Sequence, residues 1–189
     1  MPESLRQLST ALRALLVLTL LLGIAYPLLV TGVGALAFPD RSRGSLIERD
    51  GAVVGSRLLG QVFEGDQWFL PRPSVGEYDG LASGGSNLGP NEPDLVASIN
   101  ELRQDVAARE GVDPSLVPPD AVTASASGLD PDISPAYAEL QVRRVAAARS
   151  RPDAEVRALV AEHTEGRTLG FLGQPRVNVV ELNAALDRP

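Results

Sequence analysis

Few residues in this sequence are of the kinds that carry out nucleophilic, acid–base or metal chemistry. The 189 residues include no cysteine and one histidine, His163, beside Glu162 late in an expected helix. A Ser-His-Asp site would have to use this histidine, and no G-x-S-x-G nucleophile elbow is present. A metal site would have to consist mostly of carboxylates. We therefore interpret His163 as a solvated helix-end residue and predict no catalytic residue and no metal site.

The carboxylates Asp130 and Asp132 flank a proline and could bind a cation or act as paired acid and base. The segment 127–134 lacks the spacing and the distal glutamate of an EF-hand loop. An aspartate-rich turn that leads to a helix N-cap at Ser134 explains the same residues, and we favour that interpretation.

The segment 83–90, with the sequence SGGSNLGP, is the most unusual loop. Its glycines would let backbone amides converge on an anion or on a partner's backbone. It is neither a P-loop nor a G-x-G-x-x-G motif, so it is either a tight turn or a binding loop. Gln141 and Arg144 lie near the apolar line of an expected helix. Each could contact a partner, but we favour polar residues satisfied at the margin of the core.

These segments must be positioned by a chain that begins with a long apolar stretch, residues 14–39, which contains no charged residue. As a helix it would span about 39 Å, and a bilayer's hydrocarbon core is about 30 Å thick. Pro27 predicts a kink, and Thr31 with the nearby glycines predicts packing against other helices. The stretch therefore predicts a transmembrane anchor.

A cleaved signal peptide is the alternative, with Arg6 and Arg13 as its basic region and an A-x-A pattern at 35–37. The apolar length favours a retained anchor, because signal-peptide cores run to only about 7–15 residues. We expect a short cytoplasmic tail (1–13), the anchor (14–39) and an extramembrane domain (40–189). Arginines lie on both sides of the anchor, but long domains translocate largely regardless of charge, so we expect the domain outside the cytoplasm.

The expected domain is acidic. After residue 38 the chain has fifteen arginines, no lysine and twenty-three acidic residues, for a net charge of −8. Phosphate contact needs a basic surface, so this composition argues against nucleic-acid binding.

Apolar periodicity and turn residues predict short strands mixed with helices. The expected strands are 45–47 and 52–54, which form a hairpin around Asp50-Gly51, with 57–63, 68–70, 122–126 and 168–172. The expected helices run from Pro93 to Gly111, from Ser134 to about Ser150, from Pro152 to Gly166 and from Asn178 to Leu186. The predicted fold class is therefore α+β, with one N-terminal transmembrane helix followed by a single mixed α+β extramembrane domain.

A series of motifs in this order resembles the KdpC family, the C subunit of the bacterial Kdp potassium-transporting P-type ATPase. They are the anchor with YPL at 26–28, GQVF at 60–63, RPS at 72–74, SGGSNLGP at 83–90, VTASASGLDPDIS at 122–134, QVRRVAAAR at 141–149 and the segment 166–187. Two departures stand out. Asp132 takes the place of a usual histidine, and 91–93 reads Asn-Glu-Pro where Thr-Asn-Pro is usual.

The resemblance implies a non-catalytic accessory subunit of an ATP-driven, high-affinity potassium-uptake complex in the bacterial inner membrane. The implied partners are a channel-like potassium-translocating subunit, the catalytic P-type ATPase subunit, a small single-helix subunit and membrane lipid, without nucleic acid. Potassium is the transported ion. ATP would be met only through the pump subunit, with no firmly bound cofactor. The implied roles are assembly and stability of the complex, and that of a catalytic chaperone that raises the pump's affinity for ATP.

The expected partner- or nucleotide-binding residues come from the glycine-rich loop, from 127–130 and from the helix after it. They are Ser83, Gly84, Gly85, Ser86, Asn87, Gly89, Ser127, Gly128, Asp130, Gln141 and Arg144. The resemblance assigns Ser127, Gly128 and Gln141 to nucleotide contact. A domain outside the cytoplasm could not reach ATP and would instead cap the channel-like subunit. An anchored or secreted hydrolase, or a solute-binding module, that uses the 83–90 loop is the alternative function.

Overall fold

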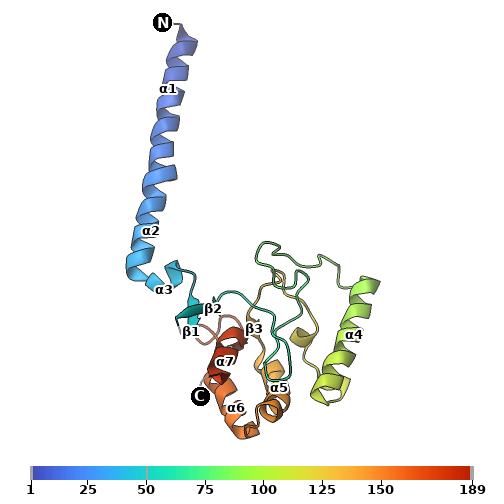
Figure 1. Cartoon of the computed structure of the whole chain (residues 1–189). Coiled ribbons are helices and arrows are strands. Elements are labelled where there is room, and N and C mark those ends of the chain that lie inside the picture. Colours follow the sequence, from blue (N-terminus) through green and yellow to red (C-terminus); the bar gives the residue numbers. More distant parts are fainter. Residues whose placement is uncertain (1, 50, 188–189) are drawn as a thin grey trace. The chain divides into compact units, whose positions relative to one another are not determined.

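The computed structural model describes residues 2–49 and 51–187. The chain forms two compact units, Met1–Leu46 and Ile47–Pro189. The first unit consists of α1 (Glu3–Leu18), a π-helical stretch η1 (Thr19–Ala25), α2 (Tyr26–Ala37) and a single turn α3 (Pro39–Ser42) (Figure 1). From Glu3 to Ala37 these elements make one helix of 35 residues, long and apolar enough to cross a membrane. None of its residues is buried within the chain, so its apolar side chains need another apolar environment.

The π-helical stretch η1 lies immediately before Pro27. Proline has no N–H, and its ring collides with the carbonyl four residues earlier in a regular α-helix. In η1 the turns are wider, and the Tyr26 N–H donates to the Leu21 carbonyl five residues back. Widened turns of this kind occur as local bulges within α-helices. The helix therefore accommodates Pro27 without ending.

The second unit contains helices and two small sheets, which confirms the predicted α+β class. Its elements are β1 (Leu46–Arg49), β2 (Ala52–Ser56), α4 (Pro93–Glu110), the 3-10 turns η2 (Pro114–Leu116) and η3 (Pro119–Ala121), β3 (Asp132–Ile133), α5 (Pro135–Ala148), α6 (Asp153–Glu162), β4 (Thr164–Glu165), β5 (Arg176–Asn178) and α7 (Val179–Leu186). β1 and β2 form the predicted hairpin. Gly51 turns there with φ 78°, and Asp50 lies outside the described residues.

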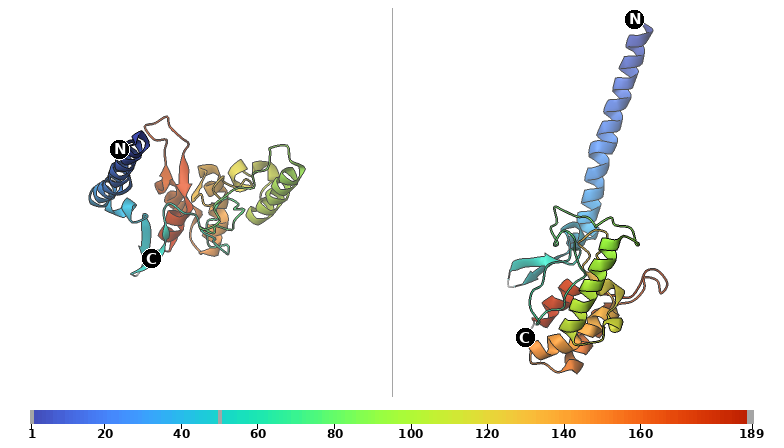
Figure 2. Two further views of the ribbon diagram at one scale, coloured as in Figure 1. Left: turned by 90° about the horizontal axis from the view of Figure 1, so that it is seen from above. Right: turned by 90° about the vertical axis from the view of Figure 1, so that its right-hand side faces the viewer.

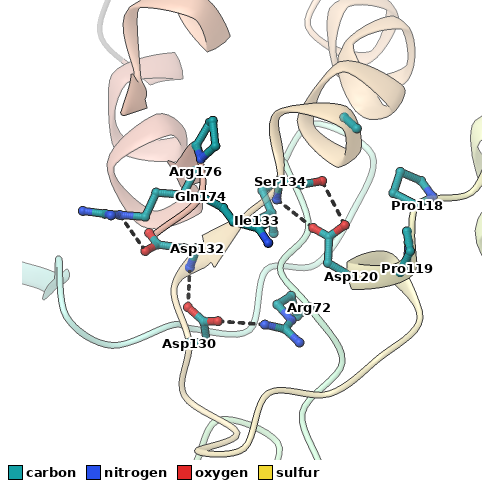
Figure 3. Close-up of a pocket in the computed structure, with 12 residues that line it drawn as sticks. Arg72, Pro118, Pro119, Asp120, Asp130, Asp132, Ile133, Ser134, Gln174 and Arg176 are labelled. Atoms are coloured by element: carbon teal, nitrogen blue, oxygen red, sulfur yellow. Dashed lines mark hydrogen bonds and ion pairs between the residues drawn. The ribbon is translucent and has the colours of Figure 1, made fainter. Parts of the chain in front are cut away.

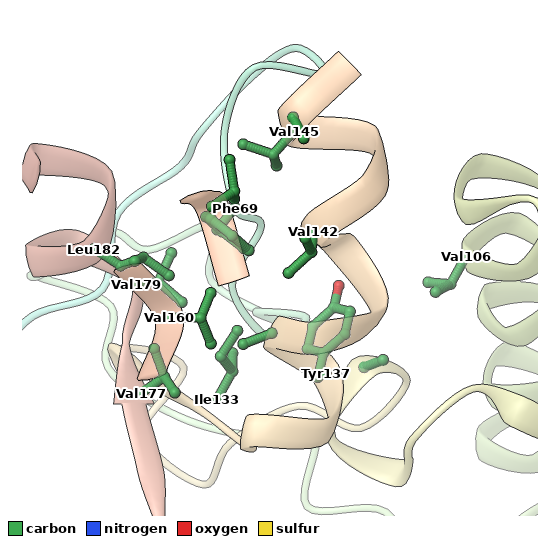
Figure 4. Close-up of a cluster of buried hydrophobic side chains, with 14 of the residues drawn as sticks. Phe69, Val106, Ile133, Tyr137, Val142, Val145, Val160, Val177, Val179 and Leu182 are labelled. Atoms are coloured by element: carbon green, nitrogen blue, oxygen red, sulfur yellow. The ribbon is translucent and has the colours of Figure 1, made fainter. Parts of the chain in front are cut away.

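The other sheet has the strand order β3-β5-β4 and is antiparallel throughout. Ile133 pairs with Val177, and Thr164 pairs with Val177 from the other side. The sheet packs with α5, α6 and α7 around a core that is drawn in Figure 4. Phe69 enters this core from a loop and is fully buried.

Helix α5 contributes one face to the core. Its buried residues are Tyr137, Ala138, Gln141, Val142, Val145 and Ala146. This stripe includes Gln141, a polar residue, beside the small residues Ala138 and Ala146, whereas Ala148 is exposed and Leu140 is only partly buried.

Helix ends are where the sequence predicted the structure best. Gly111 ends α4 in the left-handed conformation, with φ 66°. The Ser134 hydroxyl accepts from the Tyr137 N–H and caps α5. The Asn178 side chain accepts from the N–H groups of Val180 and Glu181 and caps α7. Each of these three predictions is confirmed.

Four predicted strands, 57–63, 68–70, 122–126 and 168–172, are wrong. Residues 57–63 form only an isolated bridge between Ser56 and Leu59, and residues 168–172 close on themselves in a tight turn. The segments 68–70 and 122–126 contain bends and no strand, and several of their main-chain groups bond to side chains instead of to a neighbouring strand. Apolar content therefore did not predict the backbone conformation of these four segments.

Candidate functional site

The glycine-rich loop lies against the segment 125–128. The Gly84 N–H and the Ser83 hydroxyl both donate to the Ser127 carbonyl, at 2.9 and 3.0 Å. Gly128 has φ +67°, and a Cβ there would lie 2.8 Å from the Gly84 carbonyl oxygen. The backbones can approach this closely because glycine occupies position 128. Two motifs that the sequence separates by about 40 residues thus form one surface.

The loop is exposed at Ser83 and again from Ser86 to Pro90. Asn87 adopts φ 54°, and its amide donates to the Gly85 carbonyl at 3.2 Å. The Ser86 hydroxyl accepts from the Leu88 N–H at 3.4 Å. These local bonds fix the loop while its outer edge stays accessible. The loop is therefore both the tight turn and an exposed surface.

Arg72, which was not among the expected site residues, joins these loops. Its guanidinium donates to the carbonyls of Thr123 and Ala124, each at 3.3 Å, and pairs with Asp130 at 3.0 Å. The Tyr78 hydroxyl in turn donates to the Arg72 carbonyl at 2.6 Å. Burial, reinforced by the charge of Asp130, raises the pKa of Tyr78 to about 12, so the phenol keeps its proton.

Ser74 completes this arrangement. Its hydroxyl donates to the Gly128 carbonyl at 2.7 Å and accepts from the Tyr78 N–H at 3.0 Å. Residues 72–78, 83–90 and 123–130, which we call the loop cluster, are thus joined by side-chain bonds to main-chain atoms. A cluster bonded in this way presents a fixed surface without regular secondary structure.

A cavity of about 590 Å³ opens beside the loop cluster (Figure 3). Asp130 pairs with Arg72, Asp132 pairs with Arg176 at 3.1 Å, and Asp120 accepts from the Ser134 N–H and hydroxyl. Burial and the charge of Asp130 raise the pKa of Asp132, while Arg176 opposes the rise. Among residues 2–49 and 51–187, no group of three or more His, Asp or Glu side chains could hold a metal ion.

Gln141 lies in the core, with no exposed surface. Its amide oxygen accepts from the Leu70 N–H at 2.7 Å, and its amide nitrogen donates to the Leu70 carbonyl at 3.1 Å. These two bonds reproduce the pairing that a neighbouring β-strand would give. Gln141 therefore positions Leu70 and does not face solvent.

Arg144 lies one turn further along α5 and is almost as well buried. It pairs with Glu110 at 2.9 Å, and the two side chains are 8% and 2% exposed. It also donates to the carbonyls of Asp66 and Trp68, at 2.7 and 2.9 Å. Burial raises the pKa of Glu110, and Arg144 opposes the rise. The guanidinium thus joins α4, α5 and the segment 66–70.

Comparison with known proteins places the chain in a family. The family model for KdpC, described as the c chain of a K⁺-transporting ATPase, matches residues 8–188. The chain belongs to the KdpC family. A relative from Kineococcus radiotolerans, named as the KdpC subunit of a potassium-transporting ATPase, is 57% identical over 184 residues, which cover 96% of this chain and 93% of the relative.

Other KdpC relatives are similar over the same extent. One from Beijerinckia indica is 51% identical over 185 residues, 97% of this chain and 94% of the relative. One from Mycobacterium tuberculosis is 52% identical over 187 residues, 97% of this chain and 98% of the relative. The match to the family includes most of the apolar helix, so the KdpC relationship covers both units.

Asp132 occupies the position where the resemblance to KdpC proteins leads one to expect histidine. Here its carboxylate pairs with Arg176, which also bonds to Glu165 on β4. Asp132 thereby ties β3 to β5 and, through Arg176, to β4. In this KdpC chain the residue holds an edge of the sheet together.

Two further side chains that sequence analysis missed complete the framework. Asn183 on α7 accepts from the Phe69 N–H and donates to the Phe69 carbonyl, both at 2.9 Å. Arg149 donates to the Gln67 carbonyl at 2.7 Å and lies 4.5 Å from the centre of the Trp68 ring. An asparagine in an otherwise apolar helix is a usable signal, because a buried amide needs a partner. Nothing in the sequence says that the partner is Phe69.

His163 follows α6, and its Nδ1 lies 2.9 Å from the Leu159 carbonyl. No carboxylate or hydroxyl is bonded to the ring among the described residues. The interpretation of a helix-end residue agrees with this geometry.

Proposed function

We propose that this chain is a non-catalytic accessory subunit of an ATP-driven, high-affinity potassium-uptake complex in the bacterial inner membrane. Membership of the KdpC family and the apolar helix Glu3–Ala37 support this proposal. Its partners would be a channel-like potassium-translocating subunit, the catalytic P-type ATPase subunit, a small single-helix subunit and membrane lipid. Its role would be assembly and stability of the complex.

The observation that carries the proposal is that the motif residues bond to neighbouring segments of this chain. Ser74, Ser83 and Gln141 bond to main-chain atoms of neighbouring segments. Asp130 and Arg144 are in ion pairs. Residues used in this way fix the shape of a surface, and the exposed edge 86–90 is where another chain can contact it. A subunit that works by docking needs this rigidity, because a preformed surface loses little entropy on binding.

We place the N-terminus in the cytoplasm and the domain outside it. The tendency of long domains to translocate regardless of charge supports this orientation. ATP would then lie on the opposite side of the membrane from Ser127, Gly128 and Gln141. An effect of the subunit on the pump's affinity for ATP would have to pass through the partner chains. The burial of Gln141 supports such an indirect route, because contact with a nucleotide would require Gln141 to leave Leu70.

Assembly is tested with a strain that lacks only this chain, complemented by the wild-type chain or by variants. The loss of the chain should abolish growth at very low potassium and recovery of the intact complex. Normal growth and assembly without the chain would refute the proposal. The matched variants are Ser86→Trp on the exposed edge, which should lower recovery of the complex, and Ser115→Trp on an exposed turn elsewhere, which should not.

Sidedness is tested in the cysteine-free chain with single cysteines at Ser9 and Ser150 and an impermeant thiol reagent on intact cells. We expect labelling at Ser150 and none at Ser9. The reverse pattern would place the domain in the cytoplasm, which would contradict the proposed orientation and restore direct ATP contact as a testable role.

A further inference from the structure

The connection between β4 and β5 ends in three exposed apolar side chains. Leu169, Phe171 and Leu172, which we call the apolar tip, are 79%, 67% and 49% exposed. Both views in Figure 2 show this loop projecting from the rest of the second unit. Single exposed apolar residues are ordinary, but three within four positions at the end of a projecting loop indicate a surface that is covered in use.

The tip is held in a fixed conformation. The Thr168 N–H donates to the Leu172 carbonyl and the Leu172 N–H donates to the Thr168 carbonyl, each at 2.9 Å. Between them Leu169 and Gly170 take φ 55° and 83°. A leucine is strained in the left-handed region, and such strain is retained where the surrounding structure or a function requires it. Here it directs a large apolar side chain away from the domain.

The charge around the tip differs from that of the domain. Residues 166–175 contain one arginine, Arg167, and no acidic residue, whereas the chain after residue 38 carries a net charge of −8. Arg167 is exposed and makes no ion pair with the described residues. The loop thus presents an apolar end with a single positive charge beside it.

We propose that the apolar tip inserts into an apolar pocket, with a carboxylate at its rim, on another chain of the ATPase complex. This inference rests on the proposed function, which supplies the partner chain. Charge favours a protein partner over lipid, because one arginine attracts anionic headgroups weakly while the acidic domain is repelled by them. A second copy of this chain is disfavoured because it would bring Arg167 against Arg167 and two acidic domains together.

The first test compares recovery of the subunit with the purified complex for the wild-type chain, Phe171→Asp and Leu116→Asp. Leu116 is also exposed, at 63%, and lies in η2, so it is the matched control. Because a buried aromatic anchor dominates binding energy, Phe171→Asp should lower recovery roughly tenfold or more, while Leu116→Asp should not. Arg167→Glu should also lower it. Thermal unfolding, followed by Trp68 fluorescence, should be unchanged in all three variants because the substituted side chains are exposed.

The outcomes distinguish failure of the proposed function from failure of the inference about the apolar tip. If the wild-type chain is not recovered with the complex, the proposed function is wrong. If the wild-type chain and Phe171→Asp are recovered equally, the inference about the apolar tip is wrong and the proposed function stands.

The second test identifies what covers the tip. A single cysteine at Leu172 in the full chain carries a benzophenone photocrosslinker, and the assembled complex is irradiated in membranes. A cross-link to another chain of the complex supports the proposal. A cross-link to lipid or to a second copy of this chain, or no cross-link in a complex that contains the labelled chain, overturns it.

Discussion

Replacing Arg144 with methionine should reveal how much of the domain's stability depends on one side chain. Methionine keeps an unbranched stem like that of arginine but carries no charge and donates no hydrogen bond. The change leaves Glu110 buried and unpaired, and it removes the donors to the carbonyls of Asp66 and Trp68. Breaking a buried ion pair from one side costs about 3–5 kcal/mol. Domains of this size are stable by only about 5–15 kcal/mol, so the loss should be plain.

The loss should depend on pH in a defined direction. Burial already raises the pKa of Glu110 above its usual value, and removing Arg144 should raise it further. A raised pKa favours the folded state fully at pH values below the unfolded pKa, and this contribution is lost as the pH rises through the folded pKa. The deficit of Arg144→Met should therefore be smallest near pH 4 and largest near pH 7. Each further pKa unit adds about 1.4 kcal/mol.

Trp68 provides the assay because it is the chain's only tryptophan and lies in the segment that Arg144 holds. Urea unfolding of the full chain in detergent micelles, followed by Trp68 fluorescence, gives the free energy of unfolding at each pH. Arg143→Met, on the exposed side of the same helix, is the control and should change this free energy by less than about 0.5 kcal/mol.

Two second variants separate charge from geometry. Adding Glu110→Gln to Arg144→Met should flatten the pH dependence and recover about 1–3 kcal/mol at pH 7, because an amide tolerates burial better than an unpaired carboxylate. Arg144→Lys keeps the charge beside Glu110 but cannot reach both carbonyls, so it should lose stability without steepening the pH profile. If Arg144→Met loses the same stability at pH 4 and pH 7, the argument from an unpaired buried charge is refuted.

Three further substitutions test the framework. Asn183→Ala leaves the N–H and carbonyl of Phe69 unpaired in the core and should lower the free energy of unfolding in urea by about 2–5 kcal/mol. A loss below about 1 kcal/mol would contradict a stabilising role for these two bonds. Gly128→Ala forces a Cβ to 2.8 Å from a carbonyl oxygen at φ +67°, so it should speed amide hydrogen exchange across residues 83–90, whereas Gly80→Ala, with nothing within 4 Å, should not. Ser134→Ala should cost about 1 kcal/mol through loss of the α5 cap, and an unchanged unfolding midpoint would refute that role.

What the sequence predicted well are features with a local cause. The caps at Ser134 and Asn178 and the glycine after α4 follow from residues within one helical turn of each other. The long apolar helix follows from composition alone. The false strands had a different origin, because β-propensity reports a fit to a half-buried extended surface and says nothing about which groups complete the hydrogen bonds.

In the candidate site, too, the local features could be predicted from the sequence and the long-range contacts could not. The glycine-rich loop and 127–130 were predicted as candidate site segments, but their contact through Gly84 and Ser127 depends on a long-range approach that spacing does not encode. Gln141 and Arg144 were correctly suspected of serving the core margin, since buried polar groups find partners. Their partners, main-chain atoms of 66–70, could not be inferred, because residues 68–70 are predicted from sequence as a strand.

The absence of lysine gains a physical meaning from these contacts. All seventeen basic residues are arginine. Arg144 donates at once to a carboxylate, to main-chain carbonyls and to the Gln141 amide, and Arg149 bonds to carbonyls of two different segments while lying over Trp68. A planar fork of five donors can serve several acceptors in fixed directions, which an ammonium group cannot do. A domain with short strands and long loops must satisfy its extended backbone by side chains, and arginine, glutamine and asparagine are the residues that do so here. Arg72 does the same in the loop cluster, where its guanidinium bonds to Asp130 and to the carbonyls of Thr123 and Ala124, and the docking role that we propose would depend on a cluster held in this way.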